Sequence, residues 1–163
     1  METLDYRSVS PTLMVPRLAV KLKQAEGMAP PSWAGFAKTA PFKRSLPESM
    51  DWWYVRAASV LLNLSKKSGT GVSRLSAQYG GRKVGTSKPH HVQRGSRKLI
   101  RTLIDQLEAA GFITISQGKK QVTPKAEALL SQVAAEVVEE QKEREPTLAL
   151  YAWRLNGERI GGG

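Results

Sequence analysis

The sequence predicts a mainly α-helical fold with a small β-hairpin. Three observations support this. Apolar residues recur at spacings of three and four in separate segments, as a buried helix face requires. Residues 112–123 are rich in β-branched side chains around a Gln-Gly-Lys-Lys sequence, which is typical of a hairpin. Hydrophobic residues make up 40% of the 163 residues, enough to build a packed core.

Residues 1–50 are predicted to form an extension that packs on the core. A short helix is expected over residues 12–24, with Leu13, Leu18 and Leu22 as its apolar positions. The chain is then broken repeatedly by prolines, at Pro30, Pro31, Pro41 and Pro47. Three aromatic residues in this stretch are expected to anchor it by burial: Trp33, Phe36 and Phe42.

The next two helices are predicted over residues 52–64 and 73–79. Asp51 is a candidate N-cap of the first. Its buried stripe is formed by residues at helical spacing, namely Trp53, Ala57, Val60, Leu61 and Leu64, while Trp52 and Arg56 lie on a different stripe. Gly80 and Gly81 are expected to close the second helix, since glycine suits a left-handed C-cap.

A third helix is predicted from about Ser96 to Gly111, and it is followed by the hairpin. The strands are expected over residues 112–116 and 121–123, with Lys119 and Lys120 in the turn at the tip. Thr123 and Pro124 then begin a last helix, as its N-cap and first residue. Three helices followed by a two-stranded wing is the order of a winged-helix domain, a helix-turn-helix variant. This domain is assigned to residues 51–142, and residues 143–163 to an acidic tail.

Positive charge is concentrated in the middle of the chain. The formal net charge is +11, made up of +3 in residues 1–50, +11 in residues 51–125 and −3 in residues 126–163. Such a surplus favours a polyanionic partner, because each lysine or arginine on a phosphate releases a condensed counterion. A nucleic-acid interface is therefore expected in this segment.

The start of the third helix is the most informative local feature. Arg94, Arg97, Lys98 and Arg101 cluster there, although the helix dipole disfavours cations at an N-terminus. Backbone amides at a helix start bind phosphate well, so an anion bound at this site would explain why cations cluster there. The preceding loop, residues 80–95, adds glycines and further basic or aromatic donors, at Arg82, Lys83, Lys88, His90 and His91.

The residues give no basis for an enzyme or a cofactor site. Residues 51–125 contain only three acidic side chains, Asp51, Asp105 and Glu108, and these are not placed as a metal-binding pair. Asp105 is expected to pair with Arg101 on the same helix. The adjacent His90 and His91 lack further metal ligands, and the chain has no cysteine. Neither a membrane span nor a secretory signal is expected.

A series of motifs resembles a known family. They stand in order as DWWYVRAAS (51–59), YGGRK (79–83), KPHH (88–91), RGSRKLIR (94–101) and VTPKAEALL (122–130). Together they are similar to the archaeal and eukaryotic family of small-subunit ribosomal protein nineteen, over roughly residues 5–142. The bacterial protein with the same number is unrelated. This chain departs from the family in being less arginine-rich at residues 63–67 and in extending past the usual family end.

The resemblance implies a winged-helix protein of the cytoplasmic ribosome. It would bind rRNA in the head of the small subunit, contact neighbouring ribosomal proteins and support rRNA maturation and subunit assembly, with no small-molecule substrate. A winged-helix transcription regulator that reads duplex DNA is the alternative. The candidate RNA-binding residues are Trp52, Arg56, Lys66, Lys67, Arg82, Lys83, Lys88, His90, His91, Arg94, Arg97, Lys98, Arg101, Lys119 and Lys120.

Overall fold

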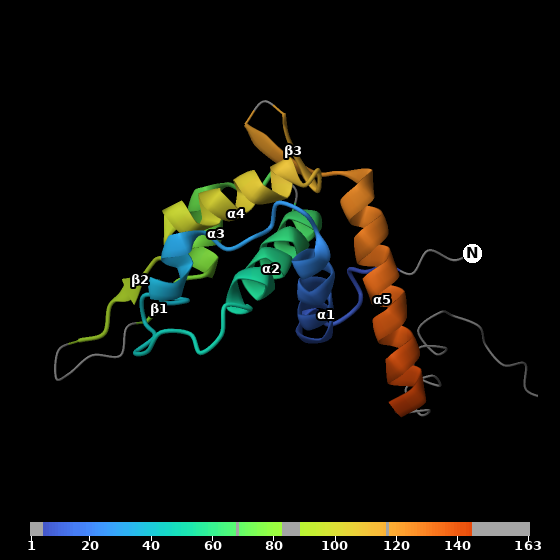
Figure 1. The fold of residues 1–163 in the computed structure, drawn as a ribbon, viewed down its shortest axis with the longest axis horizontal. Helices are drawn as coiled ribbons and strands as arrows, with labels where there is room; N and C mark the ends of the chain where they lie inside the picture. The colour runs from blue at the N-terminus through green and yellow to red at the C-terminus, as the bar shows by residue number, and fades with distance from the viewer. Residues whose placement is uncertain (1–4, 68, 83–88, 117, 145–163) are drawn as a thin grey trace, which may run out of the picture.

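A computed structural model describes residues 5–67, 69–82, 89–116 and 118–144 of the chain (Figure 1). Its helices are α1 (Pro11–Gln24), α2 (Trp52–Lys66), α3 (Val72–Gln78), α4 (Arg97–Ala109) and α5 (Pro124–Arg144), with a 3₁₀ helix, η1 (Ser32–Phe36). Its strands are β1 (Gly81–Arg82), β2 (Val92–Gln93), β3 (Ile113–Ser116) and β4 (Lys119–Val122). The predicted fold class, mainly α with a small hairpin, is confirmed.

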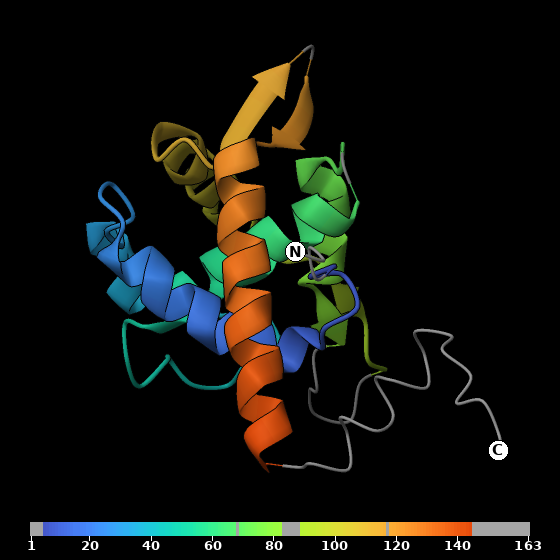
Figure 2. The ribbon, with the colours of Figure 1, turned by 90° about the vertical axis from the view of Figure 1, so that its right-hand side faces the viewer.

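The core lies around α2, which packs against α1, α4 and β4. Figures 1 and 2 show α1 lying between α2 and the long helix α5. The apolar stripe predicted for α2 is fully buried, and the predicted helix of the N-terminal extension buries Leu18 and Leu22 but leaves Leu13 exposed. The N-terminal extension therefore contributes directly to the core.

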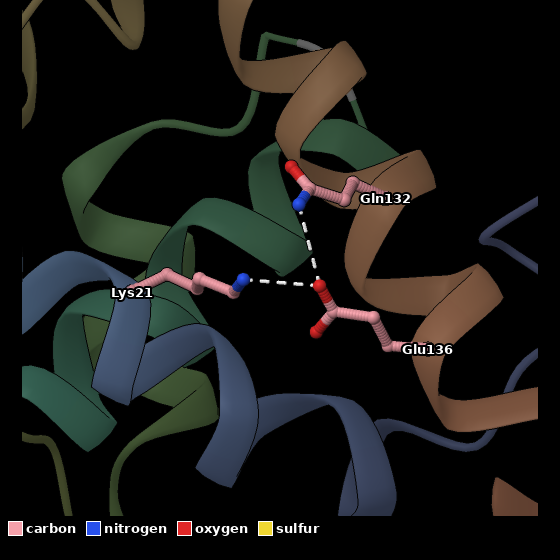
Figure 3. A network of polar contacts seen from close by, with 3 residues as sticks. All are labelled: Lys21, Gln132 and Glu136. Atoms are coloured by element: carbon pink, nitrogen blue, oxygen red, sulfur yellow. Dashed lines mark hydrogen bonds and ion pairs between the residues drawn. The ribbon is translucent and has the colours of Figure 1, made fainter.

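Ion pairs also connect α1 and α5. Lys21 Nζ donates to Glu136 Oε1 at 3.0 Å, and Gln132 Nε2 donates to the same oxygen at 3.3 Å (Figure 3). One helical turn along, Arg17 pairs with Glu140. These partly exposed pairs orient α5 on α1, although each contributes little stability because solvent screens it.

Three tryptophans connect the N-terminal extension to the helices. The fully buried ring of Trp53 meets Trp33 and Trp52 edge to face, with centroid distances of 5.6 and 5.4 Å. Trp53 Nε1 donates to Gln106 Oε1 at 2.9 Å, and Gln106 Nε2 donates to the carbonyl of Ala29 at 2.7 Å. The buried indole N–H is thus paired, and α2, α4 and the segment after α1 are held together at one point.

The predicted starts of α2, α4 and α5 are confirmed, and Asp51 occupies the predicted N-cap position of α2 without a side-chain capping bond. Ser96 Oγ accepts from the amide of Leu99, and Thr123 Oγ1 accepts from the amide of Ala126. Asp51 makes no such bond. Its backbone is already helical, and its carboxylate instead accepts from Lys23 Nζ at 2.7 Å. An ion pair to α1 takes the place of the predicted cap.

The hairpin turn is tighter than predicted. β3 and β4 pair antiparallel from Ile113 with Val122 to Ser116 with Lys119, so the predicted turn residues Lys119 and Lys120 belong to β4. The connection is only two residues long, and Gly118 has a φ of 74°, which glycine adopts readily. The amide of Gly69 donates to the carbonyl of Lys120 at 3.1 Å and so attaches the hairpin to the chain after α2.

The three aromatic residues of the Pro-rich stretch differ in how far they are buried. Trp33 packs on Trp53, as expected, whereas Phe42 is only half-buried and lies against Gly81, away from the core cluster. The prediction for Phe36 is wrong, because this side chain is 85% exposed. The core beneath η1 is already filled by Trp33 and the fully buried Ala34, which leaves Phe36 outside it.

The order α2, α3, α4, β3 and β4 is the order on which the winged-helix prediction was based. The winged-helix assignment and the limits of the predicted domains remain predictions. The predicted tail lies almost wholly outside the described residues.

Candidate nucleic-acid interface

The first turn of α4 is held by a close contact between α3 and the chain before α4. Ser76 Oγ donates to the carbonyl of Gly95, and the amide of Gly95 donates back to the carbonyl of Ser76 at 2.8 Å. β1 and β2 pair beside this contact, which the sequence did not predict. The chain directly after α3 and the chain directly before α4 are therefore held together by the Ser76–Gly95 contact and by the pairing of β1 with β2.

Glycines in this segment serve close packing. The prediction of a left-handed C-cap at Gly80 or Gly81 is wrong, because positive φ angles among the described glycines occur only at Gly27, Gly69, Gly111 and Gly118. A Cβ on Gly80 would lie 2.5 Å from the carbonyl oxygen of Gln93, and one on Gly81 would lie 2.6 Å from the ring of Phe42. The absence of a side chain lets the end of α3 approach β2.

Substitution of Gly80 by alanine is expected to displace β2 and Arg94. The new methyl group would clash with backbone atoms of Gln93 and Arg94. Overpacking of this kind costs about 1–3 kcal/mol. Urea denaturation should show the loss. Gly71→Ala is the matched control, since a Cβ there meets nothing within 4 Å. Equal stability of the two variants would contradict this account.

Arg56 lies at the centre of the cationic region. Its Nη2 donates to the carbonyl of Thr39 at 3.1 Å, and its guanidinium carbon lies 4.3 Å from the centroid of the Tyr79 ring. The Tyr79 hydroxyl is held in turn by Ser59 and Asn63. Burial lowers the pKa of Arg56, but an arginine stays protonated at neutral pH. In the described part of the chain no carboxylate pairs with this charge.

A cavity of about 260 Å³ opens beside Arg56. Its polar lining comes from three separate parts of the chain and includes Lys38, Arg56, Arg94 and Ser96. No acidic side chain is found among the described residues that line it. The site therefore combines three cations with the N-terminus of a 13-residue helix, an environment that favours an anion.

Trp52 is placed differently from the expectation. Only 9% of its surface is exposed, and its ring packs edge-on against Trp53. It lines a wider cavity of about 620 Å³ together with Arg56. Trp52 thus contributes packing beneath the interface, and little of its surface is left for contact with a base.

The exposed side of α4 carries Arg97, Lys98 and Arg101. Lys98 Nζ lies 5.5 Å from the centroid of the Trp33 ring. The ion pair expected between Arg101 and Asp105 is absent from the described residues. Arg97 and Arg101 extend from a rigid helix with their charges available to a partner.

A second basic group lies near the end of α2. It includes Lys66, Lys67 and the hairpin residues Lys119 and Lys120. Arg74 also belongs to this group, although it was not predicted from the sequence. Lys67 and Arg74 line a cavity of about 590 Å³ with Thr70 and Gln78. The sequence contains a signal for Arg74. It directly precedes Leu75, which is buried, so Arg74 falls on the exposed side of the same helix.

The two groups are joined through α3 but do not form one compact patch. Arg94 Nη1 lies 3.4 Å from Ser73 Oγ, beside Arg74. Figure 1 shows β1 and β2 near the first turn of α4 and the β3–β4 hairpin at its other end. The β3–β4 hairpin therefore follows the end of α4, whereas Arg94 precedes its first turn.

Not all predicted residues can be placed. Three of them are exposed at the small sheet: Arg82 in β1, and His90 and His91 just before β2. Lys83 and Lys88 lie outside the described residues. The basic interface is defined here as Lys38, Arg56, Lys66, Lys67, Arg74, Arg82, His90, His91, Arg94, Arg97, Lys98, Arg101, Lys119 and Lys120.

The cations of this interface differ from those of α1 in their ion pairing. Where the structure describes the chain, the three ion pairs all involve a cation of α1, namely Arg17, Lys21 or Lys23. The lysines and arginines of the basic interface make none. Charges without internal counterions remain available to an external polyanion.

The fold and the interface together define a small basic helical protein with a surface rich in cations. The family model described as Ribosomal protein S19e matches residues 5–140, and the chain belongs to this family. It is 38% identical over 142 residues to the small ribosomal subunit protein eS19 of Aeropyrum pernix, which covers 85% of this chain and 93% of that protein.

Other relatives have the same name. The eS19 protein of Thermoplasma acidophilum is 33% identical over 148 residues, covering 91% of this chain and 99% of the relative. That of Oryza sativa subsp. japonica is 33% identical over 132 residues, covering 80% and 90%. These relatives, from archaea and a plant, support the predicted archaeal and eukaryotic family. Among the described residues, no helix is long and apolar enough to cross a bilayer.

Proposed function

We propose that the protein is a structural constituent of the small ribosomal subunit that binds folded rRNA through the basic interface. One observation supports this most directly: among the described residues, the lysines and arginines of the interface have no carboxylate partner, whereas cations of α1 do. Family membership makes the chain a ribosomal protein of the small subunit, and its place is the cytoplasmic ribosome. Binding in the subunit head, contacts with neighbouring ribosomal proteins and support of rRNA maturation and assembly are part of the proposal.

Phosphates are the expected ligands of the interface. Each phosphate held by a lysine or arginine releases a counterion, so affinity comes largely from charge. The cavity beside Arg56 is suited to one such phosphate, because Lys38, Arg56 and Arg94 surround it and the amides of α4 begin there. The exposed arginines of α4 are suited to the backbone that continues past this point.

The alternative, a regulator of duplex DNA, is less well supported. Such proteins read base edges with Asn, Gln or Arg from the helix in the major groove. Gln106 is the amide side chain of α4, and both ends of it are used inside the molecule, by Trp53 and Ala29. The exposed cations of α4 favour recognition of backbone and shape.

Sedimentation with purified small subunits tests the proposal. The protein is expected to remain bound after a high-salt wash, while excess generic DNA duplex fails to remove it. Binding to free small-subunit rRNA should weaken with salt, with a slope of log affinity against log salt of about −0.7 to −0.9 per phosphate contacted. A flat salt response, or displacement by the duplex, would contradict the proposal.

A further inference from the structure

Phe36 is the most exposed large hydrophobic side chain among the described residues. Its surface is 85% exposed, compared with 50% for Leu46 and 39% for Met50 in the same part of the chain. It is the last residue of η1, whose first aromatic residue, Trp33, is partly buried on Trp53. The burial that fixes Trp33 therefore does not explain Phe36.

The position of η1 brings Phe36 to the basic interface. Lys98 Nζ, from the first turn of α4, lies over the ring of Trp33. Side chains three residues apart in a 3₁₀ helix are eclipsed, so Phe36 follows Trp33 on the same side, about 6 Å along the axis. The residues that come next, Lys38 to Pro41, line the cavity beside Arg56. Figure 1 shows η1, the short helix of residues 32–36, beside the start of α4.

The chain segment around Phe36 is basic. Residues 27–47 contain three basic residues, Lys38, Lys43 and Arg44, and no acidic residue. A protein partner with an apolar pocket for Phe36 would have to remove water from these charges and from Lys98, which is unfavourable without paired anions. A nucleotide avoids this cost, since its base stacks on an aromatic ring while its phosphate meets the neighbouring cations.

We infer that Phe36 is a stacking platform for one unpaired base of the bound RNA. The inference rests on the proposed function and adds a contact that is not ionic. The phosphate of that nucleotide lies toward Lys98 or the cavity beside Arg56. This contact adds an aromatic residue to the part of the basic interface that lies on the N-terminal extension.

Affinity for purified small-subunit rRNA, measured by filter binding across a salt series, tests the inference. Phe36→Ala is expected to weaken binding by about 5- to 100-fold, the range for loss of one base–aromatic stack. Its salt slope should equal that of the parent, because no cation is removed. Phe36→Tyr, which keeps the ring, should bind like the parent.

Leu46→Ala is the matched control, because it removes another exposed apolar side chain from the same extension. It should leave affinity unchanged. If Phe36→Ala and the parent bind equally well, the stacking inference is overturned while the proposed function stands. If the parent itself fails to bind rRNA, the proposed function fails first.

Photo-crosslinking in assembled small subunits provides a second measurement. With p-benzoylphenylalanine in place of Phe36, irradiation is expected to link the protein to rRNA. A crosslink to a neighbouring protein alone would overturn the inference and identify the segment as a protein contact.

Discussion

Replacing Trp53 with alanine is expected to lower the free energy of unfolding by about 3–5 kcal/mol. The side chain is fully buried, meets Trp33 and Trp52 edge to face and donates a hydrogen bond to Gln106. Its removal leaves a cavity where three segments join. Domains of this size are stable by roughly 5–15 kcal/mol, so a large part of the stability would be lost.

Urea denaturation followed by far-ultraviolet circular dichroism measures this effect without relying on tryptophan emission. Trp53→Phe should cost less, since it keeps an aromatic ring and loses the indole N–H. Val20→Ala is the control, because Val20 lies on α1 with 58% of its surface exposed and should tolerate the change. If the Trp53 and Val20 variants unfolded at the same urea concentration, Trp53 would not have the central packing role described here.

Replacing both Arg97 and Arg101 with alanine is expected to weaken rRNA binding about tenfold or more while the fold stays intact. Both side chains are exposed on α4, and neither makes an ion pair among the described residues. If each contacts one phosphate, the salt slope should become less steep by about 1.4 to 1.8. Filter binding across a salt series measures affinity and slope together.

The matched control removes two cations from α1. Arg17→Ala with Lys23→Ala lowers the net charge equally, but these residues pair with Glu140 and Asp51. Their loss should change rRNA affinity much less than the loss of Arg97 and Arg101. A similar decrease in both double variants would mean that net charge, and not the basic interface, determines binding.

Local sequence signals predicted the helices and the hairpin with small errors. Thr123 caps α5 as expected, and Ser96 caps α4, whose start was predicted near it, because an N-cap bond joins residues three apart in the chain. The cap predicted at Asp51 failed because a distant residue, Lys23, binds that carboxylate. The unpredicted pairing of β1 with β2 likewise depends on where α3 and α4 bring the two segments.

The sequence by itself determined the helical periodicity, the hairpin, the concentration of basic residues and the family. These properties depend on near neighbours along the chain or on composition. Only the tertiary structure decided that Trp52 is largely buried, that Phe36 is exposed, and that Lys38 joins Arg56 and Arg94 around one cavity. The reason is that periodicity identifies a face of a helix, whereas burial and proximity depend on which distant segments cover that face.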